Sequence, residues 1–223
     1  MDFSAGRNER MKQVYVHGLG QTPASWDKVL EALGTASSAV CPHLGKLIQH
    51  QEVSYDNLYR AFADFCDGLG EPMDLCGLSL GGVLALHYAA EHPEKIRSLA
   101  LIAAPYKMPK RLLRLQNMIF RLMPEKAFGP MGLGKWDFIR LCWSMMDLDF
   151  TPVLEKISCP TAVICGKKDG TNRKVCKELS TKLRNSQFFF VDGAGHEVNT
   201  QAPEKLAEIL AQFCFWGSLQ SVH

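Results

Sequence analysis

The sequence predicts a protein of the α/β class, built on a mostly parallel sheet with helices on both faces. Short apolar runs of strand length alternate along the chain with segments of helical periodicity. Strands that alternate with helices in this way pair in parallel, because each helix carries the chain back across a face of the sheet. Two further observations matter: a serine between glycines follows one apolar run directly, and the alternation is interrupted once, over residues 105–151.

The length and composition indicate a folded globular protein. The 223 residues are 47% hydrophobic and 22% charged, which suits one large domain or two small ones and excludes a disordered or fibrous chain. The net charge is +2, from 25 basic and 23 acidic residues. This balance argues against a nucleic-acid-binding protein, which needs a basic surface to neutralise phosphates.

Cysteine usage and the polarity of the chain bear on its location. The eight cysteines are scattered and form no C-x-x-C pair, so those inside apolar runs are expected to act as small hydrophobic side chains. Residues 1–12 are polar, without the apolar segment of a signal peptide, and no apolar run is as long as a membrane span. We therefore expect a cytoplasmic protein without stable membrane insertion.

The first part of the chain contains the elements that lead to the serine. Thr22 and Pro23 are typical of a helix start, because threonine caps the first turn and proline fits the first helical position. Ser54 is expected to cap a longer helix with apolar residues along one side. The expected elements are a strand at 13–16, a helix from 22 to about 34, a weak strand at 39–41, a helix at about 55–69 and a strand at 71–76.

The serine, Ser79, lies in the glycine-rich stretch 77–82, between the strand that ends at Cys76 and a run of helix formers. A tight strand-to-helix turn forces its central residue into a strained backbone and lifts its side chain clear of the sheet. Gly77 and Gly81 suit this turn, because larger side chains would crowd the neighbouring strand. The stretch predicts a nucleophilic serine; the competing interpretation is a glycine-rich turn with an incidental hydroxyl.

The alternation continues after the serine, stops and then resumes. The expected elements are a helix that ends at 92–93, strands at 97–103, 161–165 and 187–191, and helices at about 173–183 and 203–215. Residues 105–151 have helix-like apolar spacing on a basic background, with a Gly/Pro-rich break at 128–134 and an aromatic segment at 136–143. We interpret residues 12–104 and 152–216 as one core domain and the interruption as a helical cap inserted into it.

A nucleophilic serine needs a base, and the base needs an acid that orients it. Asp169 directly follows a predicted strand, and His196 follows the last strand on a loop with two glycines. Both loops belong to the carboxyl edge of a parallel sheet, which also carries Ser79. His196 is therefore the candidate base and Asp169 the candidate acid. The competing interpretations are a surface-loop histidine, a solvated turn aspartate, and the other acids Asp147, Asp149 and Asp192.

The tetrahedral intermediate of acyl transfer needs two N–H donors for its oxyanion. The N–H of Leu80 opens the helix after the serine, and the glycine-flanked turn after the first strand offers the N–H of Leu19. His17 is expected to hold this turn by hydrogen bonds, with a ligand or catalytic role as the alternative. The other histidines lack metal-ligand spacing and no nucleotide-binding motif is present, so no metal or cofactor is expected.

Four stretches together resemble the α/β-hydrolase superfamily, in particular its short, cap-bearing esterase and lactonase-like members. They are VHGLG at 16–20, CGLSLGGVLALHYAAEHPEKIRSLALIA at 76–103, GKKD at 166–169 and DGAGHEVNTQAPEKLAEIL at 192–210. The resemblance covers most of residues 13–215 except the cap. It implies an α/β-hydrolase fold with a small helical cap inserted after the sixth strand, and no cofactor. It also implies four roles: Ser79 as nucleophile, His196 as base, Asp169 as acid and Leu19 as second oxyanion donor.

Two departures from the family pattern predict a trimmed sheet. The first clear strand already precedes the oxyanion turn, where the family has a leading β-hairpin. The loop after Cys41 keeps only Pro-His-Leu-Gly in place of the family pattern D-x-x-G-x-G-x-S.

The sequence therefore predicts a serine hydrolase that cleaves a small carboxylic ester through an acyl-enzyme. The same residues leave open lactone opening, thioester hydrolysis, carbon–carbon bond hydrolysis and a lyase step, since fold and site residues do not separate these reactions. A non-catalytic ligand-binding or scaffold protein on this fold is the remaining alternative. The expected partner is a small-molecule ester, and the chain is expected to be a monomer or homodimer.

Methionine and aromatic side chains concentrate in or beside the cap, which predicts an apolar pocket over the serine. The residues expected to line this pocket are His17, Trp136, Trp143 and Met146. The alternative is that the apolar stripe only packs the cap on the core. The basic face of the cap is expected to be solvated, with attraction of an anionic substrate or a membrane surface as alternatives.

Overall fold

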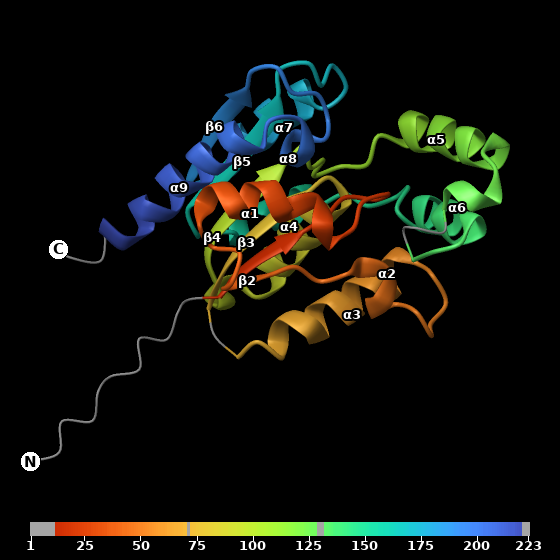
Figure 1. Ribbon diagram of the computed structural model, residues 1–223, viewed down its shortest axis with the longest axis horizontal. Coiled ribbons are helices and arrows are strands. Elements are labelled where there is room, and N and C mark those ends of the chain that lie inside the picture. Colours follow the sequence, from red (N-terminus) through yellow and green to blue (C-terminus); the bar gives the residue numbers. More distant parts are fainter. Residues whose placement is uncertain (1–11, 71, 129–131, 220–223) are drawn as a thin grey trace, which may run out of the picture.

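A computed structural model describes residues 12–70, 72–128 and 132–219 of the chain (Figure 1). Glu71, the expected first residue of a strand, and residues 129–131 of the Gly/Pro-rich break, including Met131, lie outside the described residues. Within these residues, six strands form one all-parallel sheet in the order β2-β1-β3-β4-β5-β6. The strands are β1 (Gln13–Val16), β2 (Ala39–Val40), β3 (Met73–Leu78), β4 (Ile96–Ile102), β5 (Thr161–Gly166) and β6 (Ser186–Val191). The α/β class and the parallel pairing predicted from the sequence are confirmed.

Helices connect the strands as the alternation predicted. The main helices are α1 (Asp27–Leu33), α2 (Leu44–Leu47), α3 (Tyr55–Asp67), α4 (Leu80–Glu91), α5 (Lys110–Leu122), α6 (Lys135–Ser144), α7 (Arg173–Lys182), α8 (Val198–Gln201) and α9 (Pro203–Leu219). Ser54 caps α3 as expected, because its hydroxyl accepts the N–H of Asn57 at 3.3 Å. The helix expected from Thr22 begins as a 3-10 turn, Pro23–Trp26, before α1.

Hydrophobic cores lie on both faces of the sheet, because successive residues of a strand point to opposite sides. In β1, Val14 and Val16 join a core shared with α3, α4 and α7, whereas Tyr15 joins one shared with α1 and α9. In β4, Leu99 belongs to the first core and Ala100 to the second. Helices therefore cover both faces of the sheet, as predicted.

The segment between β4 and β5 carries α5 and α6, which pack on each other at the right-hand end of the molecule in Figure 1. An antiparallel bridge between Lys107 and Asp149 joins the two ends of this segment, and the N–H of Phe150 donates to the carbonyl of Tyr106 at 2.8 Å. The segment follows the fourth described strand, whereas the resemblance implies an insertion after a sixth strand, so the placement of a cap stays a prediction. The division into a core and a cap at 105–151 stays a prediction.

None of the described helices combines the length and the apolar character that crossing a membrane requires.

Candidate active site

Ser79 is the single residue between the end of β3 and the start of α4, and its backbone has φ 52° and ψ −115°. This positive-φ conformation costs about 1–3 kcal/mol in a residue with a side chain, so the packing around the turn must maintain it. The neighbouring glycines allow that packing. A Cβ on Gly77 would lie 2.3 Å from the carbonyl oxygen of Gly81, and one on Gly81 would lie 2.3 Å from that of Val16. The turn therefore presents the Ser79 hydroxyl at the carboxyl edge of the sheet.

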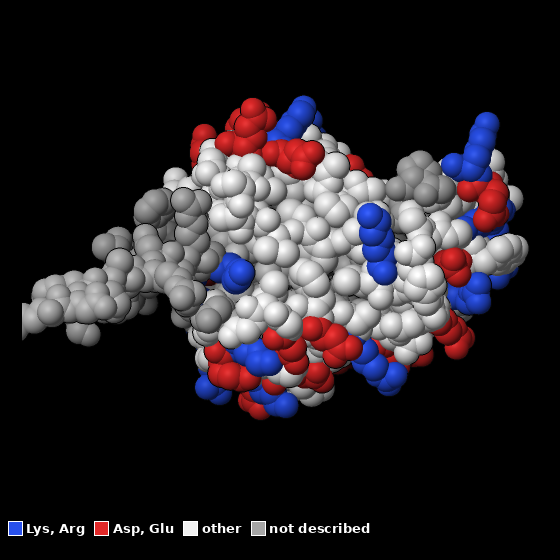
Figure 2. Space-filling view, turned by 60° about the horizontal axis from the view of Figure 1, so that its bottom comes forward, with Lys and Arg blue, Asp and Glu red and all other residues white. Residues whose placement is uncertain are grey.

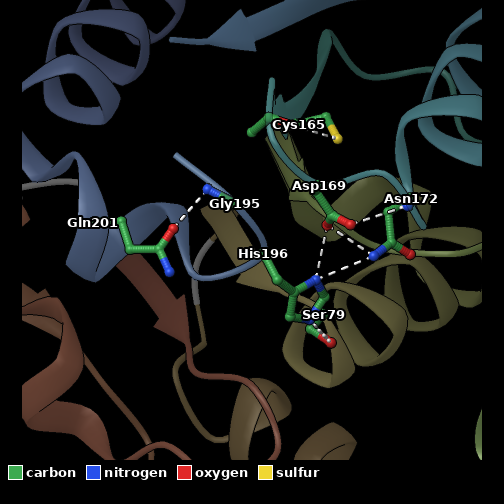
Figure 3. Close-up of polar contacts among 8 residues, drawn as sticks. Ser79, Cys165, Asp169, Asn172, Gly195, His196 and Gln201 are labelled. Carbon is green, nitrogen blue, oxygen red and sulfur yellow. Dashed lines mark hydrogen bonds and ion pairs between the residues drawn. The ribbon is translucent and has the colours of Figure 1, made fainter. Parts of the chain in front are cut away.

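His196 approaches Ser79 from the loop after β6 (Figure 3). Its Nε2 atom lies 3.0 Å from Ser79 Oγ, and its Nδ1 atom lies 2.9 Å from Asp169 Oδ2. The loop can lie close to β5 because Gly166 has no side chain: a Cβ there would be 2.0 Å from the carbonyl oxygen of Gly195. The structure thus brings the three residues singled out from the sequence into one hydrogen-bonded series.

Asp169 is the buried end of this series. Only 4% of its side chain is exposed, whereas the side chain of His196 is 45% exposed. Burial by itself raises the pKa of Asp169, but hydrogen bonds from His196 and Asn172 outweigh burial and hold this pKa below its usual value of 3.8. Asp169 is therefore a carboxylate at neutral pH. It accepts the Nδ1–H of His196, so that the unprotonated Nε2 faces the Ser79 hydroxyl.

Asn172 is a site residue that the sequence analysis did not single out. Its N–H donates to Asp169 Oδ1 at 3.1 Å, and its Nδ2 donates to Asp169 Oδ2 at 2.8 Å. Nδ2 also lies 3.1 Å from His196 Nδ1. Asn172 occupies the N-cap position of α7, where an asparagine side chain commonly caps its own helix. An asparagine three residues after the candidate acid, directly before a predicted helix, is the signal that could have identified it.

The three competing acids form ion pairs with lysines at the surface. The pairs are Asp147 with Lys110, Asp149 with Lys107 and Asp192 with Lys167. Among the four aspartates considered, only Asp169 hydrogen-bonds to His196.

The two candidate oxyanion donors, Leu19 and Leu80, border the same cavity as Ser79. Leu80 is the first residue of α4, so its N–H has no acceptor within the helix. Leu19 lies in the turn after β1, and the following Gly20 has a φ of 88°, which favours glycine. Both backbone N–H groups therefore belong to segments that converge on the serine.

His17 holds the turn of residues 18–21 by hydrogen bonds. Its Nδ1 lies 2.9 Å from the carbonyl oxygen of Gly18, and its Nε2 accepts the N–H of Leu44 at 3.2 Å. Burial is the main reason that the pKa of His17 is lowered; the bond to Gly18 acts in the opposite direction, and the nearby His43 lowers the pKa further. His17 is therefore a neutral ring that donates from Nδ1 and accepts at Nε2.

A reciprocal amide pair joins the turn of residues 18–21 to the segment after His196. Gln21 Nε2 donates to Asn199 Oδ1 and Asn199 Nδ2 donates to Gln21 Oε1, both at 3.1 Å. Gln21 Oε1 also accepts the N–H of Gly18 at 3.3 Å, and both amide side chains are buried. The two residues are 178 positions apart in the chain, and no local sequence pattern signals such a contact.

A cavity of about 380 Å³ opens beside Ser79 and His196 and is bordered by α5 and α6. This volume suits a small organic ligand. The lining side chains from α5 and α6 are mostly apolar: Leu112, Leu113, Gln116, Phe120, Phe138 and Cys142. The polar side chains Asn172 and Glu197 lie at the end that holds the imidazole. The cavity can therefore hold an apolar group with its reactive bond near the serine.

The apolar character of the cavity agrees with the expectation from the sequence, but the four named residues do not line it. Trp136 and Trp143 are 58% and 47% exposed, Met146 is buried elsewhere, and His17 is buried beside the turn of residues 18–21. The reason for the error on α6 is its helical phase. Phe138 and Cys142 are four residues apart and face the cavity, which turns both tryptophans outward.

Comparisons with known proteins place hydrolases among the relatives. The chain is 26% identical over 248 residues to a pimeloyl-[acyl-carrier protein] methyl ester esterase of Neisseria meningitidis, covering 92% of this chain and 77% of that protein. It is 27% identical over 206 residues to the monoacylglycerol lipase abhd6-B of Xenopus laevis, covering 70% of this chain and 59% of that protein. Distant homologues of the chain are thus esterases and lipases.

The fold also occurs in solved structures. The enol-lactonase from Burkholderia xenovorans superposes with a TM-score of 0.77 at 16% identity, covering 94% of this chain and 93% of that chain. This likeness concerns the fold alone. The model of the alpha/beta hydrolase family matches residues 13–209, a range that includes the whole sheet and the loops of Ser79, Asp169 and His196. The chain therefore belongs to the alpha/beta hydrolase family.

Proposed function

We propose that this protein is a serine hydrolase that cleaves carboxylic esters with an apolar acyl or alcohol part. One observation carries the proposal: Ser79, His196 and Asp169 form a continuous hydrogen-bonded series with contacts of 3.0 and 2.9 Å. A serine activated by a histidine that a buried carboxylate orients is the arrangement for acyl transfer. The esterases and lipases among the distant homologues add independent support.

In the proposed mechanism, His196 Nε2 takes the proton of Ser79 as its Oγ attacks the ester carbonyl carbon. The carbonyl oxygen becomes an oxyanion, which the N–H groups of Leu19 and Leu80 stabilise. His196 then protonates the departing alcohol, which leaves an acyl group on Ser79. Water attacks this acyl-enzyme with His196 again as the base. The bond between the acyl carbon and Ser79 Oγ then breaks, His196 returns the proton to Oγ, and the acid product leaves. Asp169 stays ionised throughout and stabilises the positive charge that develops on the imidazole.

The cavity supports an apolar substrate. Its walls offer leucine, phenylalanine and methionine side chains, whereas the polar groups lie near the reacting atoms. Methionine and leucine side chains can adapt to acyl chains of different lengths, so we propose a range of related esters as substrates. Lactones and thioesters react through the same residues, so a substrate panel has to separate them from open-chain esters.

The test is labelling and turnover by the purified chain. A fluorophosphonate probe is expected to label wild type, and Ser79→Ala is expected to lose the label and to lower kcat for p-nitrophenyl esters by roughly 10⁴-fold or more. Ser37→Ala, at an exposed serine, is the matched control and should keep both. The melting temperature reports whether each variant is folded. A folded Ser79→Ala protein that hydrolyses the esters at the wild-type rate would falsify the proposal.

A further inference from the structure

Helix α5 exposes an apolar face to solvent. The members of this face share one side of the helix at spacings of three and four residues, and their exposed fractions run from 38% to 82%. They are Leu112, Leu115, Met118, Ile119 and Leu122. In the same helix Asn117 is only 2% exposed, and its two polar side-chain atoms have no hydrogen-bond partner among the described residues. A helix whose outer face is in contact with water would instead expose its polar side chains and bury its apolar ones.

Cations border the exposed apolar face. Arg111, Arg114 and Arg121 are exposed, and they form no ion pair with any residue in the described ranges. Residues 105–151 contain eight basic and four acidic residues, a net charge of +4, whereas the remaining 17 basic and 19 acidic residues give −2. In Figure 2, Lys and Arg side chains stand out at the right-hand end, which carries α5 and α6, alongside acidic ones.

The acidic side chains of this segment are largely neutralised within it. Asp147 pairs with Lys110, and Asp149 pairs with Lys107. Asp137 pairs with Arg140 at 3.1 Å. The arginines of α5 are therefore among the charges of this segment that remain for an outside partner.

The apolar face and the cavity meet in α5. Leu112 is 38% exposed and also lines the cavity, while Leu113, Gln116 and Phe120 line it from the inner side of the helix. Only the width of α5 would therefore separate a partner bound to the exposed apolar face from the cavity beside Ser79.

We propose that α5 is an interfacial helix that binds the surface of an anionic phospholipid bilayer. A helix of 13 residues is too short to span a bilayer but can lie in its surface, with its apolar side chains among the acyl chains. The arginines beside that face would contact anionic headgroups, which attract cations near the surface. The exposed face consists of leucine, isoleucine and methionine and is bordered by arginines, which is the combination that lies in the surface of an anionic bilayer. Binding of α5 to a bilayer does not depend on the proposed function. The further step, in which lipid esters pass from the bilayer to Ser79, rests on the proposed function.

The experiment measures binding of the purified chain to vesicles by co-sedimentation. Wild type is expected to bind phosphatidylcholine vesicles that contain about 30% phosphatidylglycerol, and to bind pure phosphatidylcholine or vesicles at about 0.5 M salt much less. Leu115→Gln/Leu122→Gln and Arg114→Glu/Arg121→Glu should each weaken binding by roughly tenfold or more. The matched controls, Phe190→Gln on β6 and Lys28→Glu/Lys174→Glu on α1 and α7, should bind as wild type does.

Turnover of a soluble p-nitrophenyl ester keeps this proposal separate from the proposed function. Both α5 variants should keep that activity and their melting temperatures, and Ser79→Ala should bind vesicles as wild type does. Absence of vesicle binding in wild type overturns the docking proposal while soluble-ester turnover upholds the hydrolase. Equal binding to both lipid compositions, or a dimer of wild type that Leu115→Gln/Leu122→Gln dissociates in the absence of vesicle binding, also overturns it.

Discussion

The carboxyl edge of the sheet and the α5–α6 segment meet at one cavity but are built in opposite ways. At the edge, the buried polar side chains have hydrogen-bond partners: Asp169 is held by Asn172, and Gln21 is held by Asn199. In α5, apolar side chains face water while Asn117 is buried without a partner. The edge therefore holds Ser79, His196 and Asp169 in one geometry, whereas the α5–α6 segment leaves an apolar surface exposed. Substitutions at the edge should change chemistry, and those in the segment should change stability or access.

The largest expected effect at the edge comes from Asp169→Asn. The amide cannot stabilise a positive imidazole and favours the wrong tautomer of His196, so kcat should fall by about 10³–10⁴-fold. Asp192→Asn, at the surface aspartate paired with Lys167, is the matched control and should leave kcat unchanged. Steady-state kinetics on one p-nitrophenyl ester measures kcat for both variants. Similar losses of kcat in the two would contradict the assignment of Asp169, and not Asp192, as the acid that orients His196.

The same variant, Asp169→Asn, tests how the free energy of unfolding depends on pH. The pKa of Asp169 in the folded protein lies below 3.8, its ordinary value, so the carboxylate stabilises the fold above that pH. This contribution is lost as the pH falls below about 3.8 toward the folded-state pKa. The difference in free energy of unfolding between wild type and Asp169→Asn should therefore shrink on acidification. Urea unfolding at a series of pH values measures it, and a difference that grows toward acid pH would contradict the assignment.

Alanine substitutions at two glycines, Gly166 and Gly170, compare a closely packed position at the edge with an open one nearby. Gly166→Ala would put a Cβ 2.0 Å from the carbonyl oxygen of Gly195 and displace the loop of His196. Overpacking of this kind costs about 1–3 kcal/mol of folding free energy, and the displaced imidazole should lower kcat as well. Gly170→Ala has no atom within 4 Å of the added methyl and serves as the control. Thermal unfolding and ester turnover measured on both variants test whether close packing at Gly166 holds the loop of His196 in place.

The buried amide pair should show a smaller effect that depends on both partners. Gln21→Leu or Asn199→Leu alone leaves the other amide buried without its partner, which costs about 1–3 kcal/mol. The double variant leaves neither amide orphaned, so its loss should be smaller than the sum of the single losses. A double-mutant cycle on unfolding free energy, with kcat measured in parallel, separates the contribution to stability from the positioning of Leu19. Additive losses would show that the pair does not couple the two loops.

The smallest effect is expected in α5, with the opposite sign. Asn117→Leu removes two buried polar atoms that have no partner among the described residues, so unfolding free energy should rise by about 1 kcal/mol. Soluble-ester turnover should stay unchanged, because Asn117 does not line the cavity. A destabilised Asn117→Leu protein would indicate that the amide has a partner in the folded protein and would weaken the contrast between the two regions.

Local patterns in the sequence account for the fold class and for the candidate residues at the edge. The run from β3 through Ser79 into α4 could be predicted because a strand, a tight turn and a helix follow each other without a gap. Asp169 and His196 could be placed at the same edge because each directly follows a strand of a parallel sheet. The residues that hold them, Asn172 and the Gln21–Asn199 pair, were not identified, because such contacts depend on how loops fold onto each other.

The sequence by itself determined the order of strands and helices and the edge at which Ser79, Asp169 and His196 lie, because strand alternation and helical periodicity are local properties of a chain. Only the tertiary structure decided which side chains form the cavity. Phe138 faces it while Trp136 and Trp143 face outward, since the phase of α6 depends on what packs against it. The tertiary structure also turned the apolar face of α5 outward. A helical pattern shows that a face exists, but its neighbours in space determine what that face contacts.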